Sequence, residues 1–198
     1  MYRPSHFAQE DPAALQALMR EFPLATLVHA GAGVLSADLV PLAYDAATNT
    51  LRGHVARANP LWREAAGQPV LALFHGPQAY VSPSWYASKA LHHKVVPTWN
   101  YAVVQAHGRL EVIDDAGWLR QLVGALTESQ EAAQAAPWRV EDAPTDFVQQ
   151  MLGAIVGIEI AVDRLEGKWK MSQNRDLADR HGVVAGLGTH PAAGWVPR

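Results

Sequence analysis

The spacing of three early apolar runs constrains the fold of this chain more than any other feature. The runs cover residues 24–29, 34–42 and 50–55, and only glycines and short turn regions separate them. A parallel pair of strands needs a crossover connection of about a dozen residues or more. The gaps are too short for such crossovers, so these runs predict an antiparallel meander.

Apolar periodicity predicts the other elements. Continuous or alternating apolar residues predict further strands at 70–74, 79–82, 101–113 and 156–162. Helical spacing, with capping residues or prolines near the ends, predicts helices at 11–22, 59–66, 114–126, 146–154 and 174–181. Together, these elements predict a mainly β fold with peripheral helices (α+β), in which about six antiparallel strands form a small closed or split barrel.

Composition allows one domain and excludes several kinds of site. The chain has 198 residues, of which 49% are hydrophobic, 18% are charged and none is cysteine. This length suits a single core, expected over residues 1–187, followed by a flexible tail at 188–198. Absence of cysteine removes disulfides, thiolate nucleophiles and cysteine-based metal sites. The sequence assigns no catalytic residue and no metal ligand.

Charge and hydropathy restrict the partners. The net charge is −3 and the arginines are dispersed, so no cationic cluster of the kind that direct nucleic-acid binding needs is visible, although a dimer could gather them on one face. No stretch approaches the roughly 20 apolar residues of a membrane helix, and the start, MYRPSHFAQEDP, shows no signal peptide. We expect a cytoplasmic protein without membrane contact.

Two short stretches contain all four lysines and three of the seven tryptophans. The first is YVSPSWYASKALHHKVVPTWNY, residues 80–101, and the second, EGKWKMSQN, begins at residue 166. Lys and Asn are rarely buried without partners, and a plain surface loop has no use for so much Trp. The mixture therefore indicates a site for a flat aromatic ligand with an anionic tail.

The segment LRGHVARANPLW, residues 51–62, offers a first candidate site. Arg57 directly precedes a helix capped by Asn59, so its guanidinium and the free N–H groups of the helix could converge on a phosphate. An ordinary strand-to-helix turn with a solvated arginine explains the same pattern. His54 fits a core strand histidine better than a base.

Proline-stiffened turns in the first stretch offer polar and aromatic groups. Hydroxyls next to such a turn could donate to an anion or to a ring carbonyl at little cost in entropy. The indoles could stack on a ring system or could equally be core residues. These candidates are Ser82, Ser84, Trp85, Thr98, Trp99 and Asn100.

The segment EGKWKMSQN gives the sharpest local signal. On a strand, Lys168 and Lys170 project to one face and Trp169 to the other, which is costly unless an anion or a carboxylate neutralises the lysines. A phosphate is the natural partner, and Gln173 adds an amide suited to the polar edge of a heterocycle. The alternative is an exposed edge strand protected by its charges.

The segments GHVARANPLW, YVSPSWY, VPTWNY and EGKWKMSQNR, in this order, closely resemble the PaiB family of FMN-binding negative transcriptional regulators. The resemblance extends to about residue 187. It implies a split β-barrel of the pyridoxamine-phosphate-oxidase and flavin-reductase type, a homodimer, and FMN near the subunit interface. It makes Arg57 and Asn59 candidates for binding the phosphate of FMN, and His54 is a further candidate for the same cofactor. The candidates between residues 82 and 100 would line the flavin ring. Lys168, Lys170 and Gln173 reach the ligand from the partner subunit or secure the dimer.

The resulting hypothesis is an FMN-binding negative transcriptional regulator of the PaiB type. The protein would be a homodimer in which the bound flavin acts as the signal, and DNA would be contacted directly or through another protein. The alternative is a flavin-dependent oxidoreductase that uses NADH or NADPH and binds no DNA directly. A third possibility is a carbohydrate- or heterocycle-binding module with Trp85 and Trp99 as stacking platforms.

Overall fold

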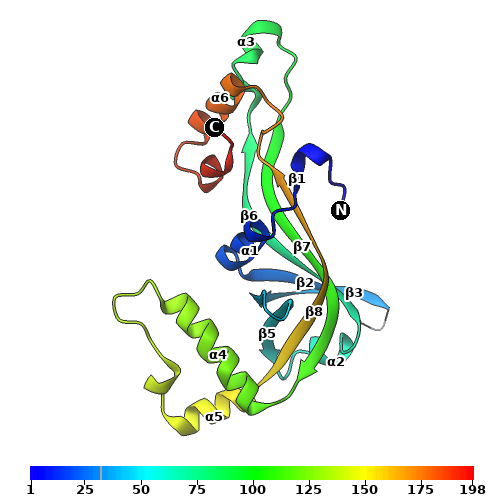
Figure 1. Cartoon of the computed structure of the whole chain (residues 1–198), viewed down its shortest axis with the longest axis vertical. Helices are drawn as coiled ribbons and strands as arrows, with labels where there is room; N and C mark the ends of the chain where they lie inside the picture. Colours follow the sequence, from blue (N-terminus) through cyan, green and yellow to red (C-terminus); the bar gives the residue numbers. More distant parts are fainter. Residues whose placement is uncertain (32) are drawn as a thin grey trace. The chain divides into compact units, whose positions relative to one another are not determined.

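The chain folds mainly as antiparallel β sheet with helices, as its periodicity predicts (Figure 1). The computed structural model describes residues 1–31 and 33–198. Contacts along the chain divide it into two units. Unit 1 comprises Met1–Phe22, Phe74–Gln105 and Glu166–Arg198, and unit 2 comprises Pro23–Leu73 and Ala106–Leu165. The single domain expected over residues 1–187 stays a prediction.

The sheet has eight strands within the described residues, in place of the six expected. The strand order is β3-β2-β6-β7-β8-β5-β4, and β1 pairs with β8. The additional strands β1 and β4 have two and three residues, too few to show an alternating pattern in a sequence. The strands are β1 (Ala8–Gln9), β2 (Leu24–Gly31), β3 (Val34–Pro41), β4 (Ala43–Asp45), β5 (Thr50–Ala56), β6 (Pro69–Val81), β7 (Thr98–Ile113) and β8 (Ile155–Lys170).

Two strands differ from the expectation in a way that bears on the site. β6 runs unbroken through Gly76 and Pro77, where the sequence predicts a gap, because proline removes only one ladder donor from a strand that is paired along the rest of its length. β8 continues past Val162 to Lys170. This extension carries the lysines of EGKWKMSQN on a strand.

Unit 2 contains the hairpin that the first two apolar runs predict. β2 pairs antiparallel with β3 and with β6. The third run, β5, pairs with β4 and β8 and not with β3, so the expected continuous meander is wrong at this point. The reason is β4, which follows β3 and forms a tight hairpin with β5 of its own.

Strands β3 and β5 still meet, although they lie near opposite ends of the strand order. A Cβ atom at Gly53 would lie 2.6 Å from the carbonyl oxygen of Pro41 and 2.8 Å from the side chain of Leu42. Only glycine fits here, because real Cβ atoms essentially never come so close. Buried apolar side chains fill the interior of unit 2: Ala25, Leu27, Val40, Leu42, Leu51, Val55, Val156, Ile158 and Ile160.

Helices α1 and α4 begin at the capping aspartates that the sequence suggests, whereas α2 and α5 begin after Pro60 and Pro144, which give no side-chain cap. The Asp11 side chain accepts from the Ala13 N–H, and Asp115 accepts from the Trp118 N–H over 2.7 Å. None of the helices within the described residues is both long and apolar enough to span a bilayer. They are α1 (Pro12–Glu21), α2 (Leu61–Glu64), α3 (Ser88–His92), α4 (Ala116–Glu131), α5 (Thr145–Gly153) and α6 (Leu177–Leu187), with 3-10 helices η1 (Ser5–Phe7), η2 (Pro83–Trp85), η3 (Val140–Asp142) and η4 (Pro191–Trp195).

A small apolar cluster in unit 1 joins the end of β6 to α6 and to the C-terminal segment. Val81, Tyr86, Val183 and Val196 are buried together. The segment 188–198 therefore packs in this structure, with Val196 only 3% exposed. Its flexibility in solution stays a prediction, because burial does not report motion.

Candidate functional site

The ends of β7 and β8 in unit 1 bring VPTWNY beside EGKWKMSQN. The Nζ of Lys170 donates to the Thr98 hydroxyl and to the carbonyl oxygen of Trp99. The Ser172 hydroxyl donates to Oδ1 of Asn100 over 3.1 Å. The two segments that mix lysine, indole and amide groups thus form one surface, because their strands are neighbours in the sheet.

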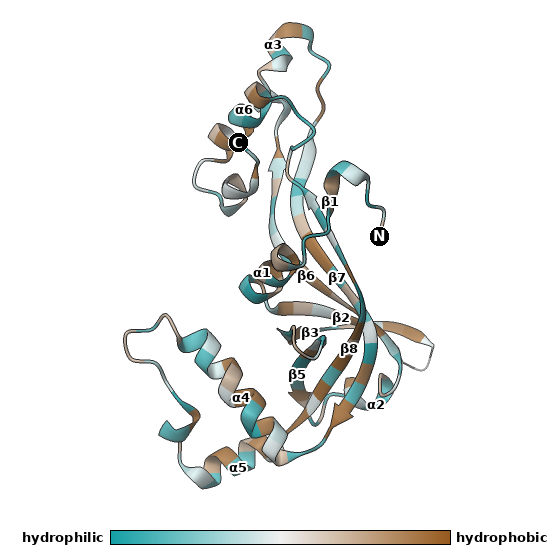
Figure 2. Ribbon diagram, viewed as in Figure 1, coloured by the Kyte–Doolittle hydropathy of each residue, from teal (hydrophilic) through white to brown (hydrophobic). Residues whose placement is uncertain are grey.

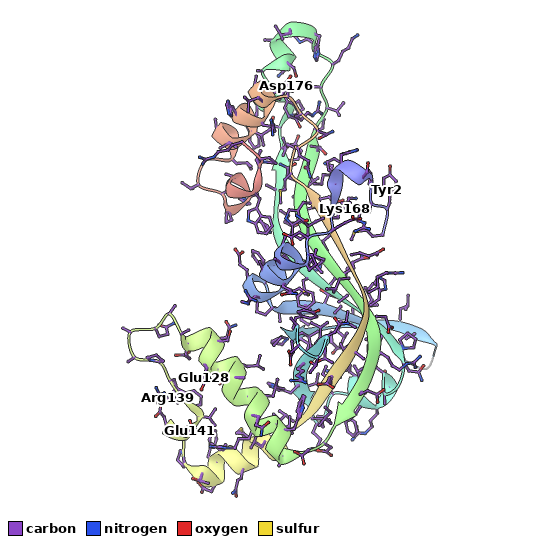
Figure 3. The ribbon with its side chains drawn as sticks, in the orientation of Figure 1. Tyr2, Glu128, Arg139, Glu141, Lys168 and Asp176 are labelled. Atoms are coloured by element: carbon purple, nitrogen blue, oxygen red, sulfur yellow. The ribbon has the colours of Figure 1, made fainter. Side chains whose placement is uncertain are left out.

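Lys168 is buried without a carboxylate partner. Lys168 is only 9% exposed, and its Nζ donates to the carbonyl oxygen of Tyr2 over 2.9 Å. The same nitrogen lies 5.6 Å from the ring centroid of Tyr2 and 5.3 Å from that of Tyr101. Lys168 and Tyr2 lie near each other (Figure 3). No ion pair in residues 1–31 and 33–198 involves Lys168. Cation–π contacts offset only part of the cost of burying an ammonium group.

Three cations lie close together around this point. Burial lowers the pKa of Lys170, and the positive charges of Lys168 and Arg175 lower that pKa further. Arg175 itself stacks over the ring of Tyr86, 4.6 Å from the centroid. We call Lys168, Lys170 and Arg175 the cation cluster. Like charges held together in this way favour an anion as a shared partner.

Unsatisfied and strained groups adjoin the cation cluster. Asn100 is fully buried, and its Nδ2 has no hydrogen-bond partner among the described residues. Ser172 has a φ of 62°, in the left-handed region that non-glycine residues rarely adopt. Strain and unpaired polar atoms concentrate at functional sites, where a ligand uses them. The residues present therefore fit an anionic group that accepts several hydrogen bonds.

Gln173 uses its amide within its own turn. Its Oε1 accepts from the Met171 N–H over 2.7 Å, and its Nε2 donates to the carbonyl oxygen of Trp169. The amide thus stabilises the chain reversal after β8. Its expected contact with a heterocycle stays a prediction.

Trp99 is available for stacking. It is 54% exposed and meets Tyr80, itself 48% exposed, edge to face with the ring centroids 6.1 Å apart. Large exposed aromatic side chains in contact are typical of binding surfaces. Of the two candidate tryptophans, Trp99 is the one with an accessible indole.

The YVSPSWY segment is mainly structural in this arrangement. Ser82 caps η2 by accepting from the Ser84 N–H over 3.2 Å, and the Ser84 hydroxyl accepts from Lys89 over 2.9 Å. The indole of Trp85 lies against Gly186 of α6 and joins the apolar cluster of unit 1. The roles of these three residues as flavin ligands stay predictions.

Arg57 in unit 2 already uses its whole guanidinium. Two of its nitrogens donate to the two carboxylate oxygens of Asp114 over 2.8 and 2.6 Å, and the group also donates to the carbonyl oxygens of Gly153 and Ile155. The hydrogen bond to Asp114 raises the pKa of Arg57 and lowers the pKa of Asp114. A phosphate would have to displace this carboxylate, so the geometry favours a structural role.

The other two candidates in unit 2 have different surroundings. Asn59, two residues before α2, accepts from the Leu61 N–H and donates to Asp38 over 2.8 Å, while the N-cap position itself is Pro60. His54 lies on β5 and lines a pocket beside α4 and α5. Their roles toward a flavin stay predictions, as does that of Arg57.

Sequence reasoning missed three contributors to the site. Tyr2 and Tyr101 enclose Lys168, and Arg175 completes the cation cluster. Arg175 directly follows the segment EGKWKMSQN, so its position in the sequence could have indicated that it belongs to the site. The carbonyl group of Tyr2 carries no signal in a sequence, because any residue there supplies the same oxygen.

Comparison with known proteins identifies the family. The model of the family described as "Putative FMN-binding domain" matches residues 1–164. The chain is 34% identical to an uncharacterized protein of Emericella nidulans, over 94% of this chain and 90% of that protein. It is 30% identical to "Protease synthase and sporulation protein PAI 2" of Bacillus subtilis, over 94% of this chain and 89% of that protein.

A solved structure shares the fold. The FAD and heme binding protein from Mycobacterium smegmatis aligns with a TM-score of 0.63 at 21% identity, covering 82% of this chain and 72% of that one. The prediction of a flavin cofactor is confirmed by the family match, which covers most of the chain. The motifs, the relatives and the fold agree, and the chain belongs to the PaiB family of proteins with an FMN-binding domain.

Proposed function

We propose that this protein holds the phosphate of FMN at the cation cluster and acts as a negative transcriptional regulator of the PaiB type. One observation carries the proposal for binding. Lys168 is buried and Lys170 is half-buried beside Arg175, and neither lysine has a carboxylate partner within the described residues. A phosphate monoester carries about two negative charges near neutral pH and several strong acceptor oxygens. It matches a group of cations that lacks a counter-charge.

The neighbouring side chains suit the rest of the cofactor. The hydroxyls of Thr98 and Ser172 are already held by hydrogen bonds beside the lysines. The exposed indole of Trp99 offers a face for an aromatic ring. When bound, FMN supplies the redox-active ring, and the protein's residues orient it and neutralise its tail.

We also propose that the sheet forms a split barrel. Six strands of ordinary length, β2, β3 and β5 to β8, would make up the barrel, with β1 and β4 as short additions. The close approach of Gly53 in β5 to Pro41 in β3 supports a seam between strands near the two ends of the order. The homodimer follows from the family resemblance, and the cytoplasmic location is the expectation from the sequence alone.

The regulatory role rests on the family, because the relative from Bacillus subtilis carries sporulation and protease synthesis in its name. We propose that the flavin is the signal and that DNA is contacted directly or through another protein. A net charge of −3 favours the indirect route. A promoter-binding assay with salt titration tests this: absence of binding to upstream DNA at low salt would remove direct repression.

Flavin retention is the decisive test of binding. The protein is mixed with FMN, passed through gel filtration, and scanned for yellow absorbance in the protein peak. Lys170→Ala should weaken retention by about tenfold, since it removes a charge-assisted hydrogen bond from a half-buried site. Lys94→Ala, which removes a lysine from an exposed position, is the matched control. Equal retention by the two variants would reassign Lys170 to a structural role.

The exposed pair Trp99 and Tyr80 favours a second candidate function. Tyr80 extends the exposed aromatic surface beside the proposed flavin position, so a nicotinamide donor could pack there and reach the flavin. The FMN-loaded protein is therefore supplied with NADH or NADPH, and consumption of the donor is followed at steady state. No turnover with either donor would count against this function and leave the regulator.

A further inference from the structure

We propose that unit 2 binds a small neutral aromatic molecule bearing a hydrogen-bond acceptor, such as a one- or two-ring aromatic ketone, in a pocket formed by β5, α4 and α5. The pocket has a volume of about 280 Å³. Its principal walls are His54, Val123, Phe147, Val148, Met151 and Leu152. The inference does not depend on the flavin proposal, because every residue that lines the pocket lies in unit 2.

The walls are apolar, and part of this apolar surface is left open to water. Phe147 is 50% exposed and Met151 is 42% exposed, whereas Val148 is buried. Figure 2 shows apolar segments alternating with hydrophilic ones along α4 and α5. Leaving such side chains in water costs free energy that a ligand would recover by covering them. A concave apolar site of this kind is typical of small-molecule binding.

His54 supplies one polar group. Its Nδ1 is buried and has no hydrogen-bond partner within the part of the chain that the structure describes. Burial lowers the pKa of His54, so the ring is neutral near pH 7. A neutral imidazole carries its single proton on one nitrogen, and a buried orphan acceptor is more readily tolerated than a buried orphan N–H. The proton therefore belongs on Nε2, and His54 offers a donor.

Charge and size narrow the ligand class. Arg120 also lines the pocket, but it pairs with Glu141 over 3.0 Å, so the site offers no free cation for an anionic group. An apolar cavity of roughly 150 Å³ accepts benzene. A volume of about 280 Å³ therefore suits one substituted ring or two fused rings. His54 is less exposed than the other lining donors, Arg120 and Trp138, and no lining residue is acidic, so the pocket favours an acceptor such as a carbonyl oxygen.

Acetophenone and ethylbenzene are the probes, because they have similar shapes and only acetophenone has a carbonyl. The full chain is labelled on its methionine methyl groups, which gives four signals, and Met151→Leu identifies the one in the pocket. Acetophenone should shift the Met151 signal and bind about tenfold more tightly than ethylbenzene, as one hydrogen bond allows. Equal affinity for the two probes, or no shift at Met151, would overturn the proposal.

Two variants test the residues. His54→Phe should abolish the preference for acetophenone while ethylbenzene still binds, and Leu152→Trp should fill the pocket and prevent binding of both. Leu91→Trp, at an 83% exposed site in unit 1, is the matched control for an added indole and should bind as the unmodified protein does. Saturating FMN should leave the acetophenone affinity unchanged. Competition by FMN would assign the pocket to the flavin ring and overturn the proposal, whereas loss of FMN binding alone would not.

Discussion

Arg57 and Asp114 form a two-pronged ion pair, with nitrogen–oxygen distances of 2.8 and 2.6 Å. The remaining donors of the guanidinium reach the carbonyl oxygens of Gly153 and Ile155. One side chain, just after β5, therefore connects to Asp114 at the start of the α4 region, to the last residue of α5 and to the first residue of β8. This fork-to-carboxylate geometry is one that lysine cannot reproduce.

We expect Arg57→Lys to lower the melting temperature and to leave flavin retention unchanged. The lysine keeps the charge but loses the forked hydrogen bonds to the carboxylate and carbonyls. Thermal unfolding and gel filtration with FMN measure the two effects separately. The opposite pattern, with unchanged melting and lost retention, would restore Arg57 as a phosphate ligand.

The same pair makes stability depend on acid pH. The hydrogen bond from Arg57 lowers the pKa of Asp114 below its ordinary value, 3.8. A carboxyl group whose pKa is lowered by folding stabilises the fold above its unfolded pKa, and this stabilisation is lost as the pH falls through the folded pKa. The unmodified protein should therefore melt higher than Asp114→Asn near pH 7, and this difference should shrink below about pH 4. A difference that is constant over this range would contradict the pairing.

Lys170 should make stability depend on pH in the alkaline range as well, again rising with pH. Burial and neighbouring cations lower its pKa in the folded protein, so the unfolded chain binds the proton more tightly. Without FMN, stability should rise as the pH increases from 7 toward the ordinary lysine value, 10.5. Lys170→Met should remove this part of the rise, and bound FMN should reduce it by favouring the charged lysine. Melting curves with and without FMN measure both effects.

Two glycine substitutions should have opposite signs, although both lie inside helices. A Cβ at Gly182 of α6 would lie 1.9 Å from the carbonyl oxygen of Trp85, whereas a Cβ at Gly124 of α4 meets nothing within 4 Å. Gly182→Ala should destabilise the protein by about 1–3 kcal/mol through overpacking. Gly124→Ala should stabilise it by about 0.5–1 kcal/mol, since alanine favours a helix. Denaturant unfolding tests both, and a gain at Gly182 would show that α6 does not pack on η2.

Trp99 should contribute to flavin affinity through its ring. Trp99→Ala is expected to weaken FMN retention by about three- to tenfold, the range of an aromatic contact. Trp99→Phe keeps a ring at this position and serves as the conservative control. Titration of protein into FMN, followed by flavin fluorescence, measures the affinities. Equal affinity of the alanine variant would remove Trp99 from the proposed site.

Local patterns allowed much of the fold to be predicted, and long-range pairing accounts for what was missed. The alternation of 101–113 predicts β7, and capping aspartates mark α1 and α4. The sequence also joins VPTWNY and EGKWKMSQN as parts of one site, which β7 and β8 bring together. Asp114 could not be foreseen as the partner of Arg57, because 57 positions separate them and no local pattern encodes the pairing. The length of β8 was left open by the sequence, because the polar residues after Val162 fit a strand or a ligand-binding segment equally well.

The enclosure of Lys168 by Tyr2 and Tyr101 has a chemical consequence. A lysine amine attacks the acyl carbon of an acylating reagent with its free lone pair, and this amine is shielded by two phenol rings and a backbone oxygen. Lys168 should therefore be acylated last of the four lysines. Its acylation, read by mass spectrometry, would register the moment at which the N-terminal segment lifts away from β8.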